Sequence, residues 1–138
     1  MTDRLIGIDF GLSKVGLSIS DPLKIISIPL KVIKYKKRKE LLSKLQEIAI
    51  ENDVKSFVIG YPLNMNNKKN EMTKLVDDFF EELKNLNFNV FLQDERLSSE
   101  SAKKIMHQQN IKTGKNKEHI DLIASTIILQ SFLDKGSF

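Results

Sequence analysis

Three acidic positions stand at the edges of apolar segments. Asp9 ends one apolar stretch, Glu95 follows Asp94 at the end of another, and Asp121 shares the inward-facing column of a predicted helix. Strand ends and an inward-facing helix residue can meet at one rim of a sheet. Three ionised carboxylates held close together repel one another unless a cation compensates them. Because hard divalent cations such as Mg2+ choose oxygen ligands, we predict a metal site formed by Asp9, Glu95 and Asp121.

Each acid also has an ordinary structural interpretation. Asp9 could form the turn that precedes Gly11. Glu95 could pair with Arg96 or with a lysine. Asp121 could stabilise the start of its helix through the helix dipole. Taken separately, none of the three positions decides between structure and function.

Glycines accompany the first acid in the pattern Asp9-x-Gly11-x-x-x-x-Gly16. They could serve tight turns and close packing, or they could let a phosphate approach the backbone amides. No Gly-Lys-Ser/Thr follows, so the pattern is not a Walker motif. A phosphate loop of the sugar kinase and actin type needs a second such domain, for which we expect no room in 138 residues.

Composition narrows the chemistry further. The chain has no cysteine, which excludes disulfides, thiolate metal ligands and a thiol nucleophile. The net charge is +4, and the basic residues gather in two clusters, at 34–39 and at 101–117. The first cluster is typical of a solvated helix entry. The second contains no acid and should rim the acidic site, so we predict phosphate contacts from Lys103, Lys104, Lys115 and Lys117.

The hydrophobic pattern predicts the elements that must position these residues. Strands are expected at 5–10, 14–20, 25–33, 56–60 and 90–92, and helices at 38–51, 72–86, 98–109 and 118–134. Pro29 suggests an edge or a bulge in the third strand. This order predicts an α/β fold, a mixed five-stranded sheet with helices on both faces, in one domain over residues 1–138. We see no targeting segment and no membrane span, and therefore expect a cytoplasmic protein.

Five ordered blocks resemble the signature of one bacterial family. They read GIDFG at 7–11, KVGLS at 14–18 followed by SDP at 20–22, VIGYPLNM at 58–65, DERLSS at 94–99 and IDLIA at 120–124. Together they resemble the YqgF family, known as pre-16S rRNA nucleases and as Holliday junction resolvase-like proteins. The resemblance implies an RNase H-like fold and metal-dependent cleavage of phosphodiester bonds.

The resemblance also implies roles for individual residues. Asp9, Glu95 and Asp121 match the catalytic, metal-binding acids, with Mg2+ or Mn2+ as cofactor; one ion would activate the water and a second would stabilise the leaving oxygen. Asp94 could support Glu95 or replace it. Arg96 could bind a phosphate or neutralise the acids. Lys14 stands where arginine is common, which keeps a substrate-binding charge but loses the bidentate fork.

Three functions remain open at this point. The leading one is a nuclease acting on structured RNA, in maturation of the 5′ end of the 16S rRNA precursor. The second is a Holliday junction resolvase in DNA recombination and repair, which ordinarily needs two symmetric active sites. The third is a nucleic-acid-binding module without catalysis. The partner is a nucleic acid in each case, no membrane is involved, and the chain could be a monomer or a homodimer. The loop at 66–70 departs from the family pattern, which leaves its role open.

Overall fold

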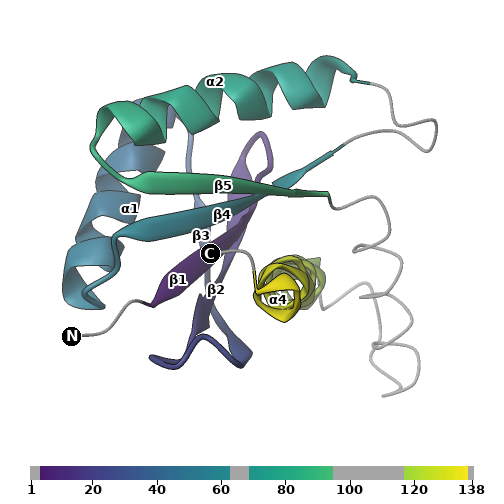
Figure 1. The fold of residues 1–138 in the computed structure, drawn as a ribbon. Coiled ribbons are helices and arrows are strands. Elements are labelled where there is room, and N and C mark those ends of the chain that lie inside the picture. Colours follow the sequence, from purple (N-terminus) through teal and green to yellow (C-terminus); the bar gives the residue numbers. More distant parts are fainter. Residues whose placement is uncertain (1–3, 63–68, 95–116, 137–138) are drawn as a thin grey trace.

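The computed structural model describes residues 4–62, 69–94 and 117–136. Its elements are, in chain order, β1 (Leu5–Asp9), β2 (Lys14–Ser20), β3 (Ser27–Lys34), α1 (Arg38–Glu51), β4 (Ser56–Tyr61), α2 (Glu71–Asn85), β5 (Asn89–Asp94) and α4 (Lys117–Lys135) (Figure 1). The helix predicted at 98–109 lies outside the described residues. The five predicted strands and the other three helices are confirmed, with ends that differ by a few residues.

The five strands form one sheet in the order β3-β2-β1-β4-β5. β1 is antiparallel to β2 and parallel to β4, and β4 is parallel to β5. The carboxyl ends of β1, β4 and β5 therefore lie at the same edge of the sheet as the start of β2. This edge carries Asp9, Asp94 and Lys14.

The third strand is an edge strand with an irregular register. Ser18 of β2 is partnered with Pro29, whereas Leu17 is partnered with Lys31, so the ladder shifts between them. Proline cannot donate a ladder hydrogen bond and is tolerated at sheet edges and bulges. Both features that Pro29 suggested are present.

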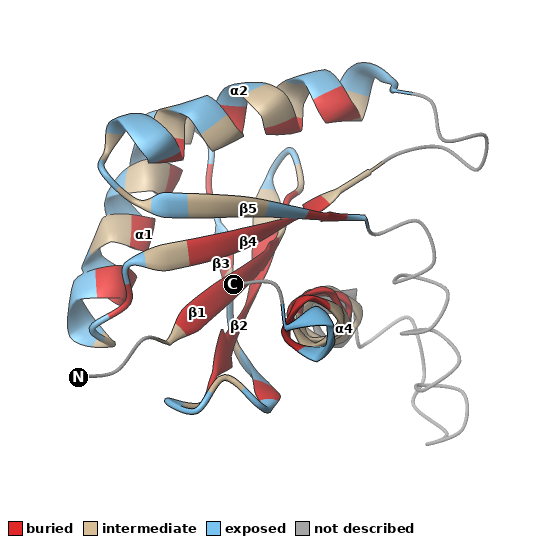
Figure 2. Cartoon of the chain, viewed as in Figure 1, coloured by how far each residue is buried: buried red, intermediate tan, exposed pale blue. Residues whose placement is uncertain are grey.

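Helices cover both faces of the sheet. α1 and α2 lie over one face, and α4 crosses the other, mainly against β1, β2 and β3 (Figure 1). The sides of α1 and α2 that are turned to the sheet are buried and their outer sides are largely exposed, whereas the outer side of α4 is mostly half-buried (Figure 2). The described residues thus form a three-layer arrangement with the sheet in the middle.

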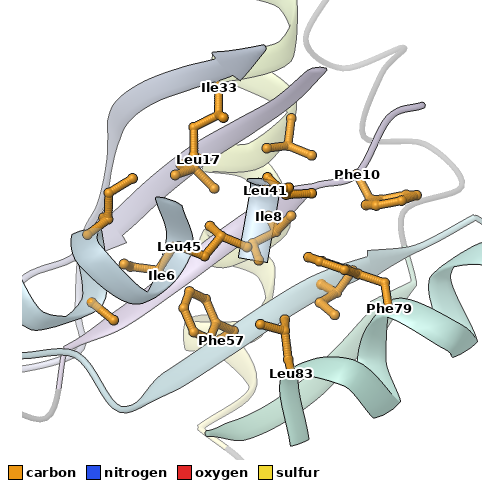
Figure 3. Packing of buried hydrophobic residues seen from close by; sticks show 14 of the residues in the cluster. Ile6, Ile8, Phe10, Leu17, Ile33, Leu41, Leu45, Phe57, Phe79 and Leu83 are labelled. Carbon is orange, nitrogen blue, oxygen red and sulfur yellow. The ribbon is translucent and has the colours of Figure 1, made fainter. Parts of the chain in front are cut away.

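Alternation along the strands divides the core between the two faces. The larger cluster faces α1 and α2 and includes Ile6, Ile8, Phe10, Leu17, Ile33, Leu41, Leu45, Phe57, Phe79 and Leu83 (Figure 3). The smaller one joins Leu5 and Val58 to four apolar side chains of α4. Residues of β1 on the parity of Leu5, which include Gly7 and Asp9, therefore belong to the α4 face. No described helix is both long and apolar enough to cross a membrane.

Candidate active site

Asp9 ends β1 on the face that α4 covers. Its Cα partner on β2 is Gly16, and its side chain is partly buried. On the other side of β1, Ile8 is partnered with Ile59, so Gly60 of β4 comes level with Asp9. Asp9 is thus flanked by a glycine on each of the two neighbouring strands.

α4 brings Asp121 to the same place. A Cβ built on Gly16 would lie 2.7 Å from the backbone carbonyl carbon of Asp121 and 3.1 Å from its Cβ. Only glycine allows the helix backbone to approach β2 so closely. Because Gly16 is the strand partner of Asp9, this contact places the two acids beside one another. Two of the three predicted carboxylates are thus brought together by elements more than a hundred residues apart in the chain.

A buried hydroxyl pair anchors α4 next to this contact. Ser18 Oγ donates to the Ser125 carbonyl at 2.8 Å, the two hydroxyls lie 2.9 Å apart, and Ser125 Oγ donates to the Gly7 carbonyl at 2.9 Å. Both serines are fully buried. These hydrogen bonds fix the helix against β1 and β2 one turn beyond Asp121.

A second set of contacts fixes the connection between β1 and β2. The Tyr35 hydroxyl donates to the Gly11 carbonyl, and the Tyr35 amide donates to Ser13 O at 2.9 Å. Burial raises the pKa of the Tyr35 hydroxyl above its ordinary value of 10.0, and the positive charge of Arg38 acts in the opposite direction. Phe10, next to Asp9, packs on Phe79 of α2 with ring centroids 4.8 Å apart. The backbone on either side of Asp9 is therefore held in place.

Lys14 forms an ion pair with one of the two acids. Its Nζ lies 3.0 Å from Asp121 Oδ2, and the side chains of Lys14 and Asp121 are 33% and 24% exposed. Oδ2 itself is buried and receives no hydrogen bond of good geometry from the part of the chain that the structure describes. The predicted phosphate-binding lysine thus contacts a predicted metal ligand directly.

The strand parity of β5 separates its polar end residues. Asp94 is partnered with Tyr61, whose hydroxyl donates to Asp77 Oδ2 of α2 at 3.2 Å, so Asp94 belongs to the face opposite Asp9. Gln93 is partnered with Gly60 and shares the α4 face with Asp9. It is 6% exposed, and its Oε1 has no hydrogen-bond partner among the described residues.

The sequence analysis missed Gln93 as a residue of the site. The alternation along β5 contained the signal. Phe91 faces α4, and Gln93, two residues later, places a polar side chain on the same face.

The first basic cluster reaches the same edge of the sheet. Lys34 ends β3 as the strand partner of Lys14. Arg38 makes structural contacts: its guanidinium forms an ion pair with Glu82 of α2 and lies 5.5 Å from the centroid of the Phe10 ring. The remaining side chains of the cluster, those of Lys36, Lys37 and Lys39, are exposed.

Several predicted site residues lie outside the described part of the chain. They are Glu95, Arg96, Lys103, Lys104 and Lys115; Lys117 begins α4, but its side chain is not described. Among the residues that the structure describes, no group of three or more His, Cys, Asp or Glu could hold a metal ion. The described donors for a cation are therefore Asp9 and Asp121. Their oxygen chemistry and the buried, hydrogen-bond-free Oδ2 of Asp121 fit a hard divalent ion.

The order of the five strands and the helices on both faces are those of the RNase H-like fold. The fold resembles a fowlpox virus resolvase solved with Holliday junction DNA, with a TM-score of 0.59 and 11% identity over 98% of this chain and 99% of the other. It also resembles RuvC of Thermus thermophilus with its junction substrate, with a TM-score of 0.51 and 14% identity over 98% and 96%. A large terminase nuclease from phage G20c with bound zinc gives a TM-score of 0.54 at 12% identity, over 90% and 79%. At these identities the likeness shows the fold.

Sequence comparison shows the family. The RuvX family model, described as "Holliday junction resolvase", matches residues 3–135, and the chain belongs to this family, which is the YqgF family of the resemblance. A relative from Ruminiclostridium cellulolyticum is 39% identical over 96% of this chain and 94% of its own. A relative from Mycoplasmopsis synoviae is 41% identical over 95% and 97%. Both are named "Putative pre-16S rRNA nuclease". The prediction of a phosphodiester-cleaving enzyme that acts on nucleic acid is confirmed at the level of the family.

Proposed function

We propose that this chain is a metal-dependent nuclease that cleaves structured RNA and matures the 5′ end of the 16S rRNA precursor in the cytoplasm. The observation that carries the proposal is the approach of Asp121 to Asp9 across Gly16. The choice of substrate rests on the names of the relatives from R. cellulolyticum and M. synoviae. The proposed cofactor is Mg2+, with Mn2+ as a substitute.

The proposed catalytic residues are Asp9, Glu95 and Asp121, and the first and last of them supply oxygen ligands from β1 and α4. A divalent ion bound there would orient and acidify an attacking water. The protein fixes these ligands before substrate arrives: Tyr35 holds the loop after Asp9, and Ser125 holds α4 beyond Asp121. Preorganisation of this kind keeps reacting groups in place without a cost during the reaction.

We propose that basic residues around this edge bind the phosphate backbone of the substrate. Lys14 lies at the site itself, and Lys34, Lys36, Lys37 and Lys39 extend the positive charge along the end of β3 and the start of α1. Arg96, Lys103, Lys104, Lys115 and Lys117 complete the proposed set. Contacts of this type do not depend on sequence and weaken with salt.

Cleavage of a four-way DNA junction is the second candidate, because the RuvX family model is described by that activity. The two candidates differ in the assembly they need. A junction resolvase presents two active sites symmetrically, whereas trimming of an RNA end needs one. Sedimentation velocity at assay concentrations distinguishes the two: a protein that is strictly monomeric while it cleaves contradicts the resolvase.

The test compares a 5′-extended fragment of the small-subunit rRNA with a synthetic four-way DNA junction, each in Mg2+, in Mn2+ and in EDTA. We expect the wild type to cut the RNA only with a divalent ion. Asp9→Asn and Asp121→Asn should each lower the rate by at least about 100-fold, because each removes a charged ligand. Asp78→Asn on the exposed side of α2 makes the same chemical change away from the site and should leave the rate unchanged.

Three outcomes contradict the proposal. Undiminished RNA cleavage by Asp9→Asn shows that the proposed catalytic site is wrong. Faster cleavage of the junction than of the RNA favours the resolvase. Metal-independent binding of both substrates without any product favours a nucleic-acid-binding module.

A further inference from the structure

The ammonium of Lys14 contacts the same carboxylate oxygen of Asp121 that would bind a metal ion at the proposed site. Lys14 begins β2 on the same parity as Gly16 and Ser18, the two residues against which α4 packs. From there its Nζ reaches to 3.0 Å from Asp121 Oδ2. The contact joins the strand next to Asp9 to the helix that carries Asp121.

The surroundings make this pair more than an ordinary surface ion pair. Asp121 Oδ2 is buried, and among the described residues Lys14 is the cation that compensates it. The carboxylate of Asp9 lies at the neighbouring strand position, so a second negative group is close to this pair. Like charges held close together disfavour one another, and the ammonium offsets that repulsion.

We propose that Lys14 is a positioning residue that competes with the divalent ion for Asp121, an inference that rests on the proposed function. Its ammonium holds the carboxylate in place until the ion binds. With an ion bound to Asp121, the ammonium would leave Oδ2, and Nζ would then bind a phosphate oxygen of the substrate. Lys14 thus contacts Asp121 before the ion binds and the substrate phosphate afterwards.

Two measurable properties follow from this exchange. Lys14 weakens the affinity of the site for the ion, because both cations use the same oxygen. Lys14 also couples the binding of the ion to the binding of the nucleic acid, because ion binding releases the amine that contacts phosphate. The ion and the nucleic acid must then each strengthen the binding of the other by the same factor.

The experiment measures Mn2+ binding by isothermal titration calorimetry in the absence of nucleic acid. Lys14→Gln removes the charge, and we expect Mn2+ to bind about tenfold more tightly than to wild type. Lys14→Arg keeps the charge and should stay within about threefold of wild type. Lys55→Gln makes the same neutralisation on an exposed residue at the opposite end of the sheet and should leave the affinity unchanged. Circular dichroism checks folding, and Lys14→Met replaces Lys14→Gln if the latter unfolds.

The outcomes separate this inference from the function on which it rests. Unchanged or weaker Mn2+ binding by folded Lys14→Gln overturns the role of Lys14, while the nuclease assignment stands if the wild type binds Mn2+ through Asp121. A wild type whose Mn2+ binding is insensitive to Asp121→Asn overturns both. In the second readout, RNA binding by wild type should tighten several-fold when Mn2+ is added, and a folded Lys14→Gln that shows the same tightening contradicts the exchange.

Discussion

The close approach of α4 to β2 makes Gly16→Ala the most direct test of how the acids are positioned. The added methyl group would lie 2.7 Å from the Asp121 carbonyl carbon, whereas ordinary contact begins at 3.4 Å, so the helix must retreat by at least 0.7 Å. Overpacking of a well-packed contact costs about 2 kcal/mol, or about 7 °C in Tm for a chain of this size. A displacement approaching 1 Å at a catalytic group lowers activity by roughly 100-fold.

Thermal unfolding and Mg2+-dependent cleavage of the rRNA fragment measure the two effects separately. Gly7→Ala is the matched comparison, since its methyl group would lie 2.7 Å from Leu129 Cβ, further along α4 than Asp121. We expect both variants to lose stability, and Gly16→Ala to lose much more activity. If Gly16→Ala keeps the Tm and the rate of wild type, α4 does not seat against Gly16 and the convergence of the acids is wrong.

Three further predictions concern residues around the site and the fold. Ser125→Ala removes the hydrogen bonds of a buried hydroxyl to Gly7 and Ser18 and should lower the free energy of unfolding by about 1–2 kcal/mol in urea titrations. Gln93→Leu removes a buried amide oxygen that has no partner among the described residues, so we expect a higher Tm together with slower cleavage; a lower Tm contradicts the burial argument. Backbone hydrogen bonds from Ile26 and Ile25 hold the pKa of Asp21 below its ordinary value of 3.8. Their contribution to stability is therefore full above pH 3.8 and is lost as the pH falls through the lower, folded-state pKa, which NMR titration and a flatter acid unfolding curve of Asp21→Asn would show.

Much of the fold follows from local patterns in the chain. The alternation of Val15, Leu17 and Ile19 marks the face of β2 that α1 and α2 bury, and the helical spacing from Met72 to Leu86 marks α2. Pro29 indicated both the edge and the irregular ladder of β3, because proline lacks the amide that a regular inner strand requires.

The convergence of Asp9 and Asp121 was predicted from strand ends and helix faces, but the details that hold them were not. The ion pair from Lys14 and the bonds between Ser18 and Ser125 join residues about 107 positions apart. Such contacts depend on how the helix crosses the sheet, which no local pattern encodes. The family resemblance implied that Lys14 binds substrate, whereas the structure places its amine on an acid.

Parity along β5 determines the face to which Asp94 belongs. The sequence analysis left open whether Asp94 supports or replaces Glu95, and the register with β4 places Asp94 on the α2 face, opposite Asp9. The choice depends on the register of β5 with β4, which shifts every side chain to the other face if it slips by one residue. The position of Glu95 lies outside the described residues, so its role as the third acid stays a prediction.

The hydrogen bonds that hold α4 against the sheet also determine when the proposed active site can form during synthesis of the chain. The Ser125 hydroxyl reaches back across 118 residues to the Gly7 carbonyl, and Asp121 contacts a strand made near the start of translation. A nascent chain that has completed β1 to β5 therefore has the sheet and Asp9 without the second carboxylate. Domains docked by such long-range contacts assemble late in folding. A chain released before α4 is made would carry the basic edge that we propose binds nucleic acid, but it would lack Asp121 of the proposed active site.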